Sequence, residues 1–194
     1  MKLEIEVADL GLPALDALAC DAIALFVGPE RPLQGFAGYC DWRLCGALSR
    51  AIREGHFTPE AGETLLLPTG GRLAPARVFS FGMREPVLSV DDFASQARRA
   101  LDAMARAQSL FFATAFPPLR GEVAGQASRL WLEASLRCPA LKQVILGEAR
   151  SLQRELVAAQ LALGADLEIV APALRVELPP RPVNVLPSRS AVIR

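Results

Sequence analysis

The chain has 194 residues with no net formal charge, and 52% of them are apolar against 22% charged. This balance suits one globular domain, and it excludes the long-range positive field that draws proteins to nucleic acid or anionic lipid. Apolar runs stay below the roughly 18–20 residues that a membrane span requires. The amino terminus is too charged for a secretory signal, so we expect a cytoplasmic protein that does not contact membranes.

Strand-like and helix-like periods alternate along the first third of the chain. Residues 2–8 alternate apolar with acidic side chains, which predicts a strand with one solvated face. The continuous apolar run Ala22–Val27 predicts a buried strand. Apolar residues then follow a helical spacing over Leu44–Ile52, and Gly55 is placed to end that helix.

The alternation continues to residue 170. We predict strands over Thr64–Leu67, Arg77–Phe81, Leu110–Phe116, Val144–Leu146 and Leu167–Val170, and helices over 93–108, 122–137 and 149–163. Ser89 or Asp91 can cap the first of these helices, and Gly164 can end the last. Strands alternating with helices require crossover connections. Residues 1–171 are therefore predicted to form a three-layer α/β domain, whose mixed, mostly parallel sheet has helices on both faces.

Residues 172–194 differ from the rest because prolines recur through them. Proline excludes a helix and favours an extended chain, so we predict an extended carboxy-terminal tail. Such a tail could lie on its own domain or on a second subunit. We expect a homo-oligomer or a protein partner held through it.

Four segments between Asp21 and Phe116 occur in the order and spacing of a known family. They are Asp21–Val27, Asp41–Ser49, Gly62–Pro68 and Ala76–Gly82. This order resembles the amino-terminal domain of the leucine aminopeptidase (M17) family, a domain related in fold to the macro domain. The resemblance implies a macro-domain-like fold.

The same resemblance implies a protein without peptidase chemistry. In that family the catalytic centre and its two metal ions belong to a carboxy-terminal domain with an N-T-D-A-E-G-R-L motif, and the one asparagine here, Asn184, matches nothing in it. Acidic residues after Leu110 are single and scattered, whereas two-metal hydrolysis needs clustered carboxylates. We expect no catalytic residues, no metal and no cofactor, and a stand-alone binding or assembly module.

Two glycine-containing loops are candidates for binding a small anion, because a phosphate needs backbone N–H groups that can approach it closely. The candidate residues are Gly35, Gly38, Thr69, Gly70, Gly71 and Arg72. They keep open the alternative of a macro-domain-like binder of a nucleotide or ADP-ribose-type ligand. In macro domains, however, the strand that corresponds to Ala22–Val27 ends in asparagines. No asparagine stands at that place in this chain.

A third alternative is a DNA-binding regulatory domain, because Arg98, Arg99 and Arg106 share a helix face. Asp102 interrupts that face and the chain is neutral, so nucleic acid is disfavoured. His56 is expected to face a helix end, without a partner that would make it a general base. The four cysteines have irregular spacings, which favours buried free thiols over a zinc site.

Overall fold

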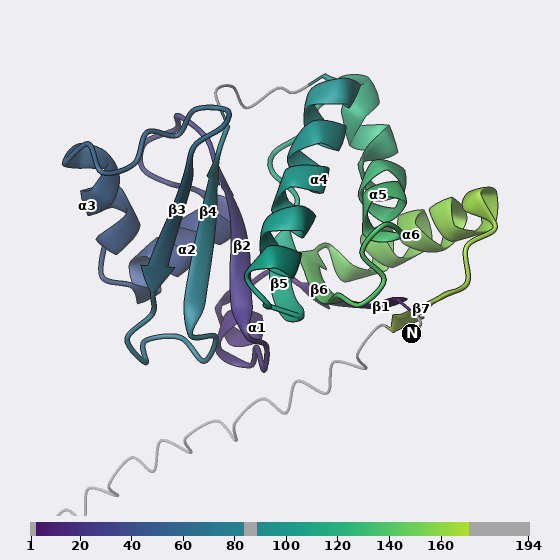
Figure 1. Cartoon of the computed structure of the whole chain (residues 1–194), viewed down its shortest axis with the longest axis horizontal. Coiled ribbons are helices and arrows are strands. Elements are labelled where there is room, and N and C mark those ends of the chain that lie inside the picture. Colours follow the sequence, from purple (N-terminus) through teal and green to yellow (C-terminus); the bar gives the residue numbers. More distant parts are fainter. Residues whose placement is uncertain (1–2, 84–88, 171–194) are drawn as a thin grey trace, which may run out of the picture.

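A seven-stranded sheet runs through the middle of the molecule (Figure 1). In spatial order its strands are β3 (Thr64–Pro68), β4 (Arg77–Gly82), β2 (Ala22–Val27), β5 (Phe111–Ala115), β6 (Lys142–Gly147), β1 (Leu3–Asp9) and β7 (Leu167–Val170). Neighbouring strands are parallel except for β3, which is antiparallel to β4. The computed structural model describes residues 3–83 and 89–170, so the tail predicted over 172–194 lies outside the described residues.

The central strand β2 shows why the domain has three layers. Its side chains alternate between the two faces of the sheet, and all six are buried. Ala24 and Phe26 enter one apolar core, and Ile23 and Leu25 enter the other. A strand that is buried on both faces needs apolar side chains at every position, which is why this segment is a continuous apolar run in the sequence.

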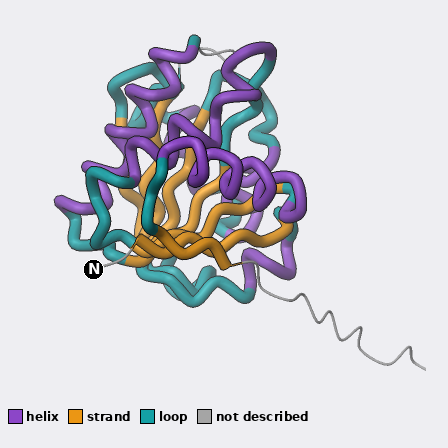
Figure 2. Tube along the Cα trace, turned by 90° about the vertical axis from the view of Figure 1, so that its right-hand side faces the viewer, coloured by secondary structure: helices purple, strands orange, loops and turns teal. Residues whose placement is uncertain are grey.

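Three helices cover each face of the sheet (Figures 1 and 2). One face carries α1 (Leu12–Asp16), α2 (Gly35–Arg43) and α3 (Ala47–Arg53), and the other carries α4 (Val90–Arg106), α5 (Gly121–Ser135) and α6 (Ala149–Leu163). The predicted α/β class, the three layers and the mixed, mostly parallel sheet are therefore confirmed. None of the described helices has both the length and the apolar character of a membrane span.

Several helix ends follow from local chemistry. Ser89 caps α4, because its hydroxyl accepts a hydrogen bond from the Asp92 N–H at 3.1 Å while the Asp92 carboxylate accepts one from the Ser89 N–H at 3.3 Å. Gly164 ends α6 in the left-handed conformation, with a φ of 59°. Both ends lie where the sequence predicts them.

The region from residue 35 to residue 53 differs from the prediction. Two helices, α2 and α3, replace the single helix expected from Leu44, and the predicted glycine loop at 35–38 is the first turn of α2. Asp41 causes the break, because its buried carboxylate accepts hydrogen bonds from the N–H groups of Leu48 at 2.9 Å and Ser49 at 3.1 Å. The Asp41 carboxylate thus supplies hydrogen-bond acceptors for N–H groups in the first turn of α3, so a new helix begins there after a turn in the chain.

Candidate functional site

The order of the strands points to one end of the sheet. From β2 the chain passes through β3 to β4 on one side of β2, and then returns to β5 on the other side. In open α/β sheets, ligands bind outside the carboxyl ends of the strands at such a switch point. β2, β4 and β5 are parallel, so their carboxyl ends meet at the same edge.

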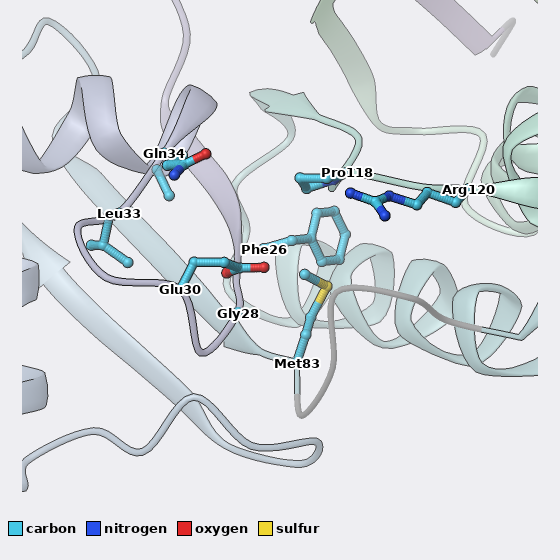
Figure 3. A pocket seen from close by; sticks show the side chains of 9 residues that line it. Phe26, Gly28, Glu30, Leu33, Gln34, Met83, Pro118 and Arg120 are labelled. Atoms are coloured by element: carbon cyan, nitrogen blue, oxygen red, sulfur yellow. The ribbon is translucent and has the colours of Figure 1, made fainter.

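A cavity of about 270 Å³ lies at this switch point (Figure 3). Its lining comes from three parts of the chain: the segment from Phe26 to Ala37, then Met83 after β4, then Pro118 and Arg120 after β5. A smaller hollow of about 170 Å³ shares part of this lining and reaches the start of α2. We call the two together the cleft.

The floor of the cleft is a rigid aromatic cluster. The ring of Phe26 packs against Phe81, with centroids 6.1 Å apart, and edge-on against Trp131 at the same separation. Trp131 is fully buried, and its indole Nε1 donates a hydrogen bond to Gln143 Oε1 at 2.7 Å. Gln143 in turn donates to the hydroxyl of Ser135 at 3.0 Å. This satisfied buried network ties α5 to β6 and keeps the floor in place.

Two helices begin beside the cleft, and neither has a side-chain cap. The first turn of α2 lines the smaller hollow, and its N-cap residue Gln34 makes no capping hydrogen bond. α5 begins at Arg120, which also makes no capping hydrogen bond and whose side chain lines the larger cavity. The free N–H groups and the dipole of a helix amino terminus attract anions. The start of α2 therefore lies in the cleft, and the start of α5 contributes the Arg120 guanidinium to it, whereas Glu122 and Val123 in the first turn of α5 line a neighbouring hollow.

Two opposite charges face the same cavity. Figure 3 shows the Glu30 carboxylate and the Arg120 guanidinium extending into it from opposite directions, with the ring of Phe26 between them in this view. Neither group has an ion-pair partner within residues 3–83 and 89–170. Both charges are therefore available to a ligand.

The structure places the two predicted glycine loops at opposite ends of the sheet. Gly35 lines the smaller hollow and has a φ of 55°. Gly38 lies one turn further along α2, where a Cβ atom would stand 2.5 Å from the Leu33 carbonyl oxygen. Gly38 thus lets the segment before the helix pack closely on it, which shapes the cleft wall.

The other four predicted residues form the turn between β3 and β4, at the amino ends of the parallel strands. Thr69 donates its N–H to Ala76 O at 3.0 Å, and Gly70 and Gly71 have φ values of 59° and 78°. The Arg72 guanidinium donates to the sulfur of Cys45. Thr69 and Arg72 thus already make hydrogen bonds within the protein, and the turn lies away from the cleft. The structure therefore does not bring the two loops together.

Sequence reasoning missed the residues that give the cleft its chemistry, namely Phe26, Glu30, Met83, Pro118 and Arg120. One signal was available, because each of them follows or ends a predicted parallel strand. The carboxyl ends of such strands lie at one edge of a sheet, so these positions could have been grouped.

The remaining candidates for chemistry have structural surroundings. Exposed His56 lies at the end of α3, with its Nε2 3.6 Å from the Glu54 carboxylate. All four cysteines are free; burial raises the pKa of the Cys20 thiol to about 11 and raises that of Cys40 further still. Cys45 is exposed and Cys138 is only partly buried, which corrects the expectation that all four thiols are buried. No group of three or more metal-binding side chains gathers within the described residues.

No protein-family model matches the chain, and no curated protein matches it. Solved macrodomain structures share its fold. An Oceanobacillus iheyensis macrodomain mutant is 14% identical, with a match covering 82% of this chain and 92% of that chain and a TM-score of 0.59. The macrodomain of Mycobacterium tuberculosis DarG is 14% identical, covering 75% and 98%, with a TM-score of 0.57. The Trypanosoma brucei macrodomain in complex with ADP-ribose is 13% identical, covering 82% and 69%, with a TM-score of 0.63.

These likenesses correct the resemblance to the leucine aminopeptidase family. The matching structures named above are macrodomains and not M17 amino-terminal domains, so the M17 assignment is wrong, and the stand-alone M17-type assembly module inferred from it is wrong as well. The relation to the macro-domain fold holds. The four segments misled because they are packing motifs, and short apolar runs bounded by turn residues specify a buried strand rather than one family.

Proposed function

We propose that the cleft binds a nucleotide-like ligand of the ADP-ribose class, with its phosphate groups between the starts of α2 and α5. The observation that carries the proposal is that the uncapped start of α2 and the Arg120 guanidinium, which has no ion-pair partner among the described residues, meet at the switch point of the sheet. Within the cleft, Phe26 and Met83 offer an apolar surface for the flat part of such a ligand.

Arg120 is expected to contribute most of the affinity for phosphate. A hydrogen bond to a charged group contributes about 1.5–3 kcal/mol, whereas an anion at an exposed helix amino terminus gains only about 0.3–1 kcal/mol. Loss of the guanidinium should thus weaken binding about 10- to 100-fold, since 1.4 kcal/mol corresponds to tenfold.

The fold likeness supports the proposal. Two of the matching structures are the Trypanosoma brucei macrodomain in complex with ADP-ribose and in complex with ADP. They share only 13% and 15% of their residues with this chain, so their ligands are a reason to test these molecules first.

We propose binding without turnover. The described side chains that line the cleft include no cysteine, histidine or serine, and Glu30 is the one carboxylate among them. A nucleophile paired with a general base is therefore missing from this lining.

A thermal-shift measurement tests the proposal with ADP-ribose, ADP, AMP and adenosine. A ligand present at 100 times its Kd stabilises the folded state by about 2.7 kcal/mol. For a chain of this size that is a rise in Tm of roughly 5–10 °C. We expect the rise with the phosphate-containing ligands and little of it with adenosine.

Arg120→Gln should abolish most of the rise, and Arg72→Gln is the matched control because it removes a guanidinium at the opposite end of the sheet. The proposal is wrong if none of the phosphate-containing ligands raises the Tm of the wild type. It is equally wrong if the two arginine variants lose the rise to the same extent.

A further inference from the structure

Among the residues that the structure describes, Glu30 is the one acidic side chain that lines the larger cavity, and it belongs to the segment between β2 and α2. Its carboxylate folds back over Gly28, so closely that a Cβ atom at Gly28 would collide with it. Gly28 is buried and does not have a left-handed φ, so its backbone would accept alanine. The missing Cβ is therefore what leaves room for the carboxylate.

The nearest cation along the chain is turned away from this carboxylate. The guanidinium of Arg31 donates one hydrogen bond to the carbonyl oxygen of Gly28 at 3.0 Å and another to the main-chain carbonyl of Glu30. No hydrogen bond to the Glu30 carboxylate comes from any described residue. An ionised carboxylate can only accept hydrogen bonds, so it offers acceptor oxygens to whatever occupies the cavity.

Arg120 and Glu30 thus divide the cavity by charge. A ligand that fills it must present its anionic group toward Arg120, because a second anionic group near Glu30 would meet a like charge. On the Glu30 side, favourable partners are groups that donate hydrogen bonds, namely hydroxyl or amino groups. The apolar floor at Phe26 separates the two sides.

Resting on the proposed function, we infer that Glu30 determines specificity in the cleft. It selects phosphate-bearing ligands that carry hydroxyl or amino donors at the end away from the phosphate held by Arg120, and it rejects ligands with an additional anionic group there. A site built to pair with a donor rejects strongly the analogue that lacks it, because its own polar group is then left unpaired.

Calorimetric titration of the full chain tests this inference with four ligands. ADP-ribose against ADP measures the contribution of terminal hydroxyl donors. ADP against purine riboside 5′-diphosphate, which lacks the amino group and gains no other donor on the base, measures that of the amino group, and ATP adds an anionic group. In one of the two ligand pairs, we expect the wild type to bind the donor-bearing member at least about tenfold more tightly than the other member, which corresponds to roughly 1.4 kcal/mol. We also expect it to bind ATP more weakly than ADP.

Two variants remove the selection by different routes. Glu30→Gln removes the charge, and Gly28→Ala keeps the charge but displaces the carboxylate. In both, the preference for the donor-bearing ligand should fall about tenfold, and in Glu30→Gln the affinity for ATP should rise toward that for ADP. Glu168→Gln on the exposed surface of β7 is the control and should behave as the wild type.

The outcomes separate this inference from the proposed function. If the ligands bind and depend on Arg120, but both cleft variants keep the wild-type preference, the role of Glu30 is wrong and the proposed function stands. If the wild type binds none of the ligands, both are wrong. The ligand pair whose preference collapses in Glu30→Gln identifies the donor as hydroxyl or amino. The Tm of each unliganded variant shows that it is folded.

Discussion

The two ends of the sheet use the same kinds of side chain in opposite ways. At the amino end, Lys142 lies 2.8 Å from carboxylate oxygens of both Glu4 and Glu6, and its ammonium is 4.7 Å from the ring centre of Phe111. At the carboxyl end, the cleft holds Glu30 and Arg120, neither of which has an ion-pair partner among the described residues. The charge of Lys142 is thus engaged within the protein, whereas those of Glu30 and Arg120 are available to a ligand.

This contrast distinguishes charged groups that already have partners from those that are candidates for ligand binding. The hydrogen bonds from Lys142 to Glu4 and Glu6 raise the pKa of that lysine to about 12, which shows that its charge is already engaged. Among the described residues, the charged groups of the cleft have no partners comparable to those of Lys142, and the two helices that begin beside the cleft have no side-chain caps. Ligand binding is therefore expected at the end where partners are missing.

The largest expected effect comes from truncating one aromatic ring at each end. Phe26→Ala removes a buried side chain that packs on Phe81 and Trp131, so unfolding should become easier by about 3–5 kcal/mol. Phe111 is only partly buried, and Phe111→Ala should cost clearly less. Urea denaturation of both variants measures the difference. Equal losses would show that the aromatic floor has no special role in holding the cleft.

Two glycine substitutions give the next largest effect. Gly38→Ala forces a Cβ against the Leu33 carbonyl, which should cost about 1–3 kcal/mol and should also weaken nucleotide binding because the cleft wall moves. Gly71→Ala strains a left-handed turn residue at the other end, at about 1–2 kcal/mol. Binding by that variant should be unchanged. If Gly71→Ala weakened binding as Gly38→Ala does, the cleft would not be the binding site.

The smallest effect is expected at Lys142. Lys142→Met should lower the free energy of unfolding by no more than about 1 kcal/mol near neutral pH, because the ion pairs are partly exposed. The pKa of Lys142 is higher in the folded state, so its contribution is complete below the ordinary pKa of 10.5 and disappears as the pH rises through about 12. Urea denaturation at pH 8 and pH 12 should show the difference between wild type and variant shrinking. A difference that grows with pH contradicts this account.

Much of the fold could be predicted from sequence because its signals are local. The six buried residues of β2, the capping box at Ser89 and the left-handed Gly164 each lie within a few residues of the feature that they specify. The break between α2 and α3 could not be predicted in this way. It depends on Asp41 reaching the start of the next helix, and two glycines hid the first turn of α2 from a pattern based on apolar spacing.

The candidate site was harder to predict for the same reason. Gly35 and Gly38 were identified because glycine is conspicuous, whereas Arg120 is one arginine among many until the sheet brings it opposite Glu30. The turn at Thr69 offers an equally plausible glycine pattern, and only the antiparallel pairing of β3 with β4 places it at the other end. Sequence spacing does not determine the order and direction of the strands, and these place the two loops at opposite ends of the sheet.

The cleft draws its walls from Phe26 and the segment after β2, from Met83 after β4, and from Pro118 and Arg120 after β5. Its two charged groups, Glu30 and Arg120, follow different strands and come together only when β2, β4 and β5 pair. Affinity for a nucleotide would consequently be a property of the completed sheet, absent from any fragment that lacks one of these strands. A bound ligand would slow hydrogen exchange across β2, β4 and β5 together, so that occupancy would be read out as cooperative protection of the domain's centre.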